Sequence, residues 1–172
     1  MPVDMRTANS RDDYTTPKAL FDRCNECWGP FEVDLAASTQ NTLCPKYYSK
    51  ENSALDPMNV WVGKCWCNPP YGRLMQHFLQ KSITQKSLEV GVFLVPCRIG
   101  SKWFRQWYKE AARRKEVAII LLSKRLQFSG MKNTAQFDSM LVVCGEANHV
   151  TAGVFSWFKG GCPEAMKLFF KV

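Results

Sequence analysis

The chain has 172 residues, of which 46% are hydrophobic and 13% aromatic, as expected for one folded domain and not for a disordered protein. No apolar run approaches the ~20 residues that a membrane span requires, and the first residues lack the apolar segment of a signal peptide. The eight cysteines are therefore expected to be free thiols in a reducing, cytoplasmic compartment. The net charge of +8 leaves a polyanionic partner open.

Helical and extended segments alternate along the chain after a polar stretch, residues 1–13, that is expected to be a flexible N-terminus. Proline favours the first turn of a helix, and strands buried on both faces are continuously apolar. In chain order, the expected elements are a helix beginning at Thr16-Pro17, strands over 31–35 and 65–67, a helix over 74–83, a strand over 90–95, a helix over 102–115, and strands over 117–122, 137–144, 154–158 and 168–172. Residues 36–60 are turn-rich and predict no long element.

This alternation predicts an α/β fold, with a sheet covered by helices on both faces, in a single domain over residues 14–172. Sheets of this kind bind ligands at the carboxyl ends of their strands. Here those ends carry Asp34, Asn68, residues 96–98 and residues 123–125. A site is therefore expected along this edge of the sheet.

Basic residues are concentrated between positions 98 and 132, where ten basic and two acidic residues give a local net charge of +8. The basic residues are Arg98, Lys102, Arg105, Lys109, Arg113, Arg114, Lys115, Lys124, Arg125 and Lys132. The rest of the chain is neutral. This distribution favours contact with a polyanion such as a nucleic acid, and a solvated helix face is the alternative for any single lysine.

The sequence Asn68-Pro69-Pro70-Tyr71 follows a predicted strand directly. Prolines have a fixed φ and no N–H, so their carbonyls stay available as acceptors on a stiff turn. Together with the Asn68 side-chain oxygen they can accept both hydrogens of one –NH2 group, while the Tyr71 ring can stack on a planar ring. The motif suits an aromatic amine such as that of adenine, whose delocalised lone pair these acceptors would localise for attack.

With this motif as anchor, the sequence resembles the phage-type, Dam-like N6-adenine DNA methyltransferases. The resemblance covers most of the chain. It includes Thr16-Pro17-x-x-Leu20-Phe21, residues 33–38 with Asn41 and Cys44, Tyr47-Tyr48 to Leu55, Trp61, Trp66-x-Asn68-Pro69-Pro70-Tyr71-Gly72, Leu94-Val95-Pro96, Trp103-Phe104, Arg125-Leu126-x-Phe128 and Phe137-x-Ser139. In place of the glycine-rich loop usual in this fold class the chain has residues 36–38, and Ser53 stands where many relatives have an acidic residue.

The resemblance implies a class I, Rossmann-like, S-adenosylmethionine-dependent fold in one minimal domain, without a separate target-recognition domain. It implies transfer of a methyl group from S-adenosylmethionine to the N6 amine of an adenine flipped out of double-stranded DNA. The implied catalytic residues are Asn68, Pro69, Pro70 and Tyr71, and the implied cofactor-binding residues are Thr16, Pro17, Asp34, Ala36, Ser53 and Asn68. A phage- or prophage-encoded enzyme acting inside a host cell, with no membrane partner, is expected.

The target base is expected to stack on Tyr71 and Phe128, although a core role at a strand end is the alternative for Phe128. Phosphate contacts are assigned to basic groups near the strand ends, namely Arg73, Arg98, Lys124, Arg125 and Lys132. Sequence specificity would reside in residues 36–60 or 125–136.

Other acceptors remain open, because the motif serves any planar –NH2 group. They are adenine in RNA and a side-chain amide in a protein, and an inactive nucleic-acid-binding relative is a further alternative. Cytosine N4 transfer is disfavoured because those enzymes usually carry Ser in place of Asn68. The cysteine spacings do not match a standard zinc site, so no metal is expected.

Overall fold

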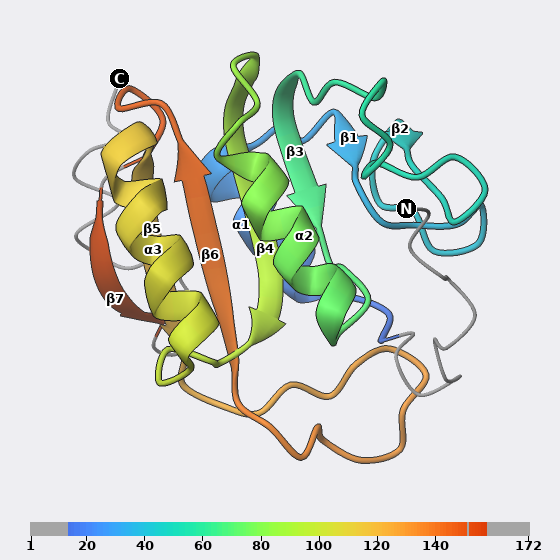
Figure 1. Ribbon diagram of the computed structural model, residues 1–172. Helices are drawn as coiled ribbons and strands as arrows, with labels where there is room; N and C mark the ends of the chain where they lie inside the picture. The colour runs from blue at the N-terminus through green and yellow to red at the C-terminus, as the bar shows by residue number, and fades with distance from the viewer. Residues whose placement is uncertain (1–13, 151, 158–172) are drawn as a thin grey trace.

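The computed structural model describes residues 14–150 and 152–157. These residues form a seven-stranded sheet with helices on both faces (Figure 1). The elements are α1 (Lys18–Trp28), β1 (Val33–Asp34), β2 (Lys46–Tyr47), β3 (Gly63–Cys67), α2 (Arg73–Ser82), β4 (Leu88–Pro96), α3 (Lys102–Arg114), β5 (Glu116–Leu122), β6 (Ser139–Gly145) and β7 (Gly153–Trp157). The predicted α/β class is confirmed.

The strand order is β2-β1-β3-β4-β6-β5-β7, and β6 alone runs antiparallel to its neighbours. The parallel strands therefore end at one common edge, which is the lower edge in Figure 1. The residues that follow β1, β3, β4 and β5 lie there, together with the start of β6. This is the edge at which the sequence predicts a site.

Two apolar layers hold the helices against the sheet. α2 and α3 lie on the front face in Figure 1 and bury Phe78 and Trp107 there. On the opposite face α1 buries Phe21 and Trp28 against Trp66 of β3. Side chains alternate across a strand, so Cys65 and Cys67 join the first layer while Trp66 joins the second. Burial on both faces explains why the central strands are apolar throughout.

Most elements predicted within the described residues are observed, and the differences lie in the short strands. The strand predicted over 31–35 is reduced to two residues in β1, because Val33 and Asp34 alone pair with both neighbours. The turn-rich stretch 36–60 contains β2, a two-residue edge strand that sequence periodicity cannot reveal. Residues 1–13, Phe158 and the strand predicted over 168–172 lie outside the described residues.

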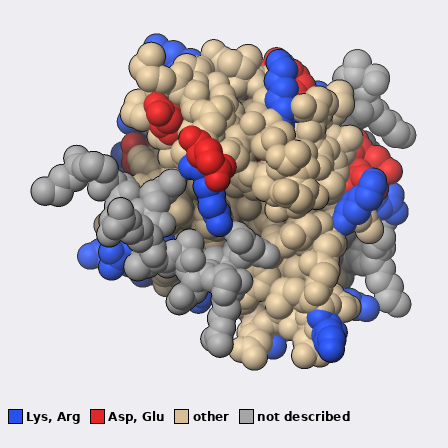
Figure 2. Space-filling model, turned by 90° about the vertical axis from the view of Figure 1, so that its right-hand side faces the viewer, with Lys and Arg blue, Asp and Glu red and all other residues tan. Residues whose placement is uncertain are grey.

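The basic residues of segment 98–132 are divided between the two edges of the sheet, and the loop residues to which phosphate contacts are assigned lie at the site edge. α3 starts after β4 and ends before β5, so it carries Arg113, Arg114 and Lys115 to the edge of the sheet opposite the predicted site. The loops that follow β4 and β5 keep their basic residues at the site edge. In Figure 2 the visible acidic side chains lie in the upper half, and the charged side chains visible along the lower edge are basic.

The remaining composition-based expectations concern thiols, metals and membranes. The seven cysteines within the described residues are free thiols. The same residues contain no group of three or more His, Cys, Asp or Glu side chains that could hold a metal ion. None of the described helices is long and apolar enough to cross a membrane.

Candidate active site

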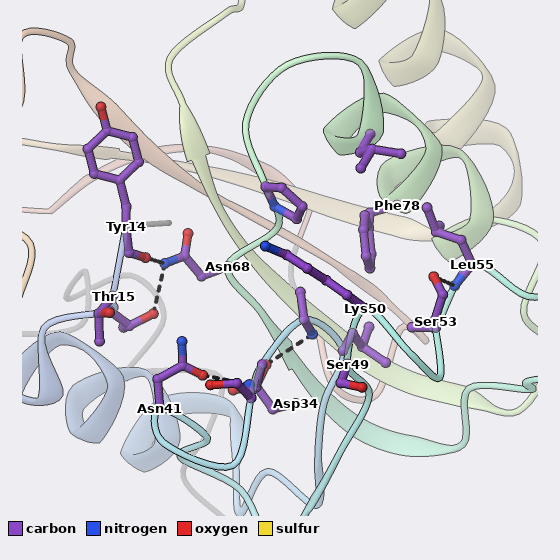
Figure 3. A pocket seen from close by; sticks show the side chains of 18 of the residues that line it. Tyr14, Thr15, Asp34, Asn41, Ser49, Lys50, Ser53, Leu55, Asn68 and Phe78 are labelled. Atoms are coloured by element: carbon purple, nitrogen blue, oxygen red, sulfur yellow. Dashed lines mark hydrogen bonds between the residues drawn. The ribbon is translucent and has the colours of Figure 1, made fainter. Parts of the chain in front are cut away.

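A cavity of about 370 Å³ opens at the carboxyl ends of β1 and β3 (Figure 3). A volume of this size is typical of sites for small molecules and cofactors. The cavity is lined by residues 14–16, 34–38, 41, 49–51, 53–55, 68, 70, 74 and 78. Of the predicted cofactor residues, Thr16, Asp34, Ala36, Ser53 and Asn68 line it, whereas Pro17 does not and instead caps the start of α1.

Asp34 brings a buried carboxyl group to the cavity at the end of β1. The residue is 4% exposed, and its Oδ1 accepts a hydrogen bond from the Ala36 N–H at 3.2 Å. Burial raises the pKa of Asp34 to about 6, although the backbone N–H groups of Ala36 and Leu43 work in the opposite direction. The carboxyl group therefore titrates near neutral pH and can respond to a ligand that carries positive charge or hydroxyl donors.

The far wall of the cavity is a loop that includes Ser53, and Lys81 of α2 holds it in place. The Lys81 ammonium donates to the carbonyl oxygens of Ala54, Asp56 and Asn59, each at 2.7 Å. It also lies 5.4 Å from the centre of the Trp61 ring, whose Nε1 donates to the same Ala54 oxygen at 2.9 Å. Ser53 Oγ accepts from the Leu55 N–H.

Asn68 lies at the end of β3 between the cavity and the segment that precedes α1. Its Nδ2 donates to the carbonyl oxygen of Tyr14 and to Thr16 Oγ1, the latter at 3.1 Å. The chain then passes through the two prolines and Tyr71 to Gly72, whose φ of 107° turns it into α2. Pro70 lines the cavity, whereas Pro69 and Tyr71 do not.

Tyr71 belongs to a cluster of aromatic rings and is not open to the cavity. The Tyr14 ring stacks on it, with centroids 5.3 Å apart and planes 27° apart, and Phe137 meets it edge-on at 5.5 Å. Phe128 is 1% exposed and lies 4.8 Å from Tyr14, which is the core environment named above as its alternative. Burial raises the pKa of the Tyr71 hydroxyl, which has no hydrogen-bond partner within the described residues.

The predicted phosphate-binding residues are all exposed to solvent and all lie at the edge of the sheet where the cavity opens. Each begins or lies in a segment that follows the carboxyl end of a strand; they are Arg73, Arg98, Lys124, Arg125 and Lys132. Arg125 is partly neutralised, because its Nε lies 3.3 Å from Asp138 Oδ1. Lys124 and Lys132 have no ion-pair partner among the described residues.

The sequence analysis missed several residues of this site. Leu74 and Phe78 form an apolar wall one helical turn apart on α2, and their i, i+4 spacing directly after the proline motif is a signal that could have identified them. Lys50 extends across the cavity toward Asn68 in Figure 3, and Glu51 lines the cavity beside it. Both follow β2, which the sequence did not predict.

The arrangement of strands and helices is that of a class I methyltransferase. A crystal structure of a putative class I S-adenosylmethionine-dependent methyltransferase from Listeria monocytogenes matches this fold with a TM-score of 0.56. The match covers 86% of this chain and 66% of that chain at 13% sequence identity, so it shows the fold.

Sequence comparison identifies the family. A model of the DNA N-6-adenine-methyltransferase (Dam) family matches residues 5–151, and the chain belongs to this family. A DNA N-6-adenine-methyltransferase of Escherichia phage T1 is 33% identical over 106 residues, which are 59% of this chain and 43% of that protein. The putative methyltransferase YfdM of Escherichia coli (strain K12) is 34% identical over 65 residues, covering 35% of this chain and 71% of that protein. The chain thus spans less than half of the phage relative's length.

Proposed function

We propose that this protein transfers a methyl group from S-adenosylmethionine to the N6 amine of an adenine flipped out of double-stranded DNA. Family membership and fold support methyl transfer. The family match supports adenine in DNA as the acceptor. The structural observation that carries transfer to an amine is Asn68 at the end of β3, beside the cavity, with its amide nitrogen already engaged and its oxygen available as an acceptor. The cytoplasm is the compartment in which such a DNA substrate occurs.

The cavity fits S-adenosylmethionine in size and in the chemistry of its walls. Its volume suits a molecule of this size, and Leu74 and Phe78 supply an apolar wall for an adenine ring. The buried Asp34 and the neighbouring Glu51 supply acceptors for hydroxyl and ammonium donors. The small Ala36 lets the backbone after β1 approach the ligand closely. When bound, the cofactor supplies an electrophilic methyl group.

The residues of this chain would act on the acceptor amine. Asn68 Oδ1 and the Pro69 carbonyl accept its two hydrogens, which localises the nitrogen lone pair and stabilises the positive charge that develops during attack. Once the methyl group is bound, N6 carries four bonds and a positive charge and is therefore acidic. It loses one proton to water, so no basic side chain is required at this nitrogen.

Base entry requires a rearrangement of the aromatic cluster. The face of Tyr71 on which a base would stack is covered by the Tyr14 ring. We assign the rotation of this side chain to the base-flipping step, which costs a few kcal/mol for a paired base. Stacking of the base on Tyr71 returns roughly 1–3 kcal/mol. Phe128 joins as a second stacking surface only after Tyr14 has moved.

The DNA would approach the lower edge in Figure 1, where Lys124 and Lys132 are exposed. Each phosphate contact contributes about 0.9 to the slope of log K against log salt concentration. Replacing both lysines with alanine should therefore flatten this slope by about 1.8 units. The matched control is the α3 pair Lys109 and Arg113, which should leave the slope unchanged. Flattening by the helix pair alone would place the DNA on another surface.

The direct test of the function is methyl transfer by purified protein to DNA, RNA and protein acceptors, with tritiated S-adenosylmethionine. DNA should be labelled, and Asn68→Ala should lower the rate ~10²–10³-fold, as for loss of one preorganised polar group. Asn148→Ala, at an exposed position that follows β6 at the opposite edge of the sheet, is the matched control and should retain wild-type activity. Preferential labelling of RNA or protein, or near-native turnover by Asn68→Ala, would overturn the proposal.

A further inference from the structure

The segment Tyr14–Thr16 crosses the end of β3 and contacts Asn68 in a way that the family motif does not specify. Both polar contacts of the Asn68 amide nitrogen go to this segment, one to the Tyr14 carbonyl oxygen and one to Thr16 Oγ1 at 3.1 Å. Thr16 is 7% exposed, so water does not compete freely for its hydroxyl. The two acceptors lie 54 and 52 residues before Asn68 in the sequence.

These contacts determine which way the amide group points. A backbone carbonyl can only accept hydrogen bonds, so only the –NH2 side of Asn68 can face Tyr14 favourably. The reversed amide would place Oδ1 against the Tyr14 oxygen and would leave two acceptors in contact. Figure 3 shows the nitrogen directed at the Tyr14–Thr16 segment and the oxygen directed away from it. Among the described residues, no donor occupies Asn68 Oδ1.

The Tyr14–Thr16 segment is itself hydrogen-bonded to the loop between β5 and β6. Thr15 forms an antiparallel bridge with Ser129, whose N–H donates to the Thr15 oxygen at 2.9 Å. Ser129 Oγ also donates to the Thr16 carbonyl oxygen at 3.3 Å. Anchoring to the loop that precedes β6 fixes the acceptors in place, so Asn68 is held by a preorganised partner and not by a freely moving end of the chain.

We infer that Thr16 is a positioning residue for methyl transfer: with the Tyr14 carbonyl, its hydroxyl oxygen fixes the Asn68 amide so that Oδ1 faces the acceptor amine. This inference rests on the proposed function, in which Asn68 Oδ1 accepts from that amine. It differs from the expectation that Thr16 serves the cofactor, because it predicts an effect on the transfer step. An amide turned the other way would present donors to an amine and could not stabilise it.

The inference is tested by removing the Thr16 oxygen while keeping the shape of the side chain. Thr16→Val should lower kcat about three- to tenfold at saturating cofactor and DNA, the loss expected for one hydrogen bond of about 1 kcal/mol. The Kd for S-adenosylhomocysteine should stay within about twofold of wild type, because the inference assigns the Thr16 hydroxyl to Asn68 and not to the cofactor. Thr16→Ser retains the oxygen and should restore kcat. Thr16→Ala removes the oxygen without placing a methyl group against the amide and should behave as Thr16→Val does.

A double-substitution cycle separates positioning from general damage. In an Asn68→Ala background, Thr16→Val should have no further effect on the single-turnover rate, because its partner is gone. Wild-type kcat in Thr16→Val and Thr16→Ala, a weaker cofactor Kd with unchanged kcat, or additive losses in the cycle would each overturn the inference. If wild-type protein did not methylate DNA, the proposed function would fail first. An active wild type with an unaffected Thr16→Val would refute the inference alone.

Discussion

The buried carboxyl group of Asp34 should make cofactor affinity depend on pH. Burial raises its pKa to about 6, so in the unliganded protein it is about one-tenth ionised at pH 5 and about nine-tenths ionised at pH 7. If the ionised form binds the cofactor, the Kd for S-adenosylhomocysteine should fall about tenfold over this interval. The ligand's own amino and carboxyl groups do not titrate there, which isolates the effect of Asp34.

Protein stability should change in the opposite direction over the same interval. The pKa of Asp34 is higher in the folded protein than its ordinary value of 3.8, so the folded state binds the proton more tightly. The contribution of this group to stability is therefore complete below pH 3.8 and is lost as pH rises through about 6. Asp34 should thus favour ligand binding at pH 7 while reducing the stability of the unliganded protein.

Isothermal titration calorimetry at pH 5, 6 and 7 measures the predicted change in affinity. Wild-type protein should bind S-adenosylhomocysteine about tenfold more tightly at pH 7 than at pH 5, whereas Asp34→Asn should bind more weakly with a flat profile. Asp138→Asn, which alters an exposed carboxylate outside the cavity, should retain the wild-type profile. A flat wild-type profile, or tighter binding at pH 5, would refute the assignment of Asp34 to the ionised, ligand-binding form.

Two further substitutions test the walls of the site. Lys81→Met removes the ammonium that binds three loop carbonyls and should lower the free energy of unfolding by about 2–3 kcal/mol in urea titrations, with weaker cofactor binding; an unchanged unfolding midpoint would show that the loop is held by other contacts. Tyr14→Ala uncovers the Tyr71 ring and should increase the fluorescence of DNA carrying 2-aminopurine at the target position, whereas Tyr14→Phe should behave as wild type. Equal fluorescence in all three proteins would mean that Tyr14 does not block base entry.

Local sequence signals were sufficient to predict most of the described elements and the edge of the sheet at which the cavity lies. α3 shows the amphipathic spacing that buries Phe104 and Trp107, and β4 is apolar because both of its faces are covered. The proline motif has a stiff local geometry that does not depend on distant contacts, so its position at the end of β3 followed from the sequence. The positions of Asp34 and Asn68 at one edge followed from parallel strands sharing their carboxyl ends.

Contacts between residues far apart in the sequence could not be predicted in this way. Nothing in the local pattern around Tyr14 indicates that its ring stacks on Tyr71, or that its carbonyl orients Asn68. The Lys81 ammonium resembles a solvated helix charge until the loop carbonyls are seen around it. The concentration of basic residues in segment 98–132 does not by itself show that α3 carries Arg113 to the edge of the sheet opposite the site.

The identity of the methylated nucleoside tests the central claim most directly. Purified protein would be incubated with S-adenosylmethionine carrying a deuterated methyl group and with plasmid DNA from a host that lacks adenine methylation, and the digested nucleosides would be analysed by mass spectrometry. Deuterated N6-methyldeoxyadenosine should appear with wild-type protein and be reduced ~10²–10³-fold with Asn68→Ala. Deuterium in N4-methyldeoxycytidine, or no labelled nucleoside from DNA, would contradict the assignment of adenine N6 as the acceptor.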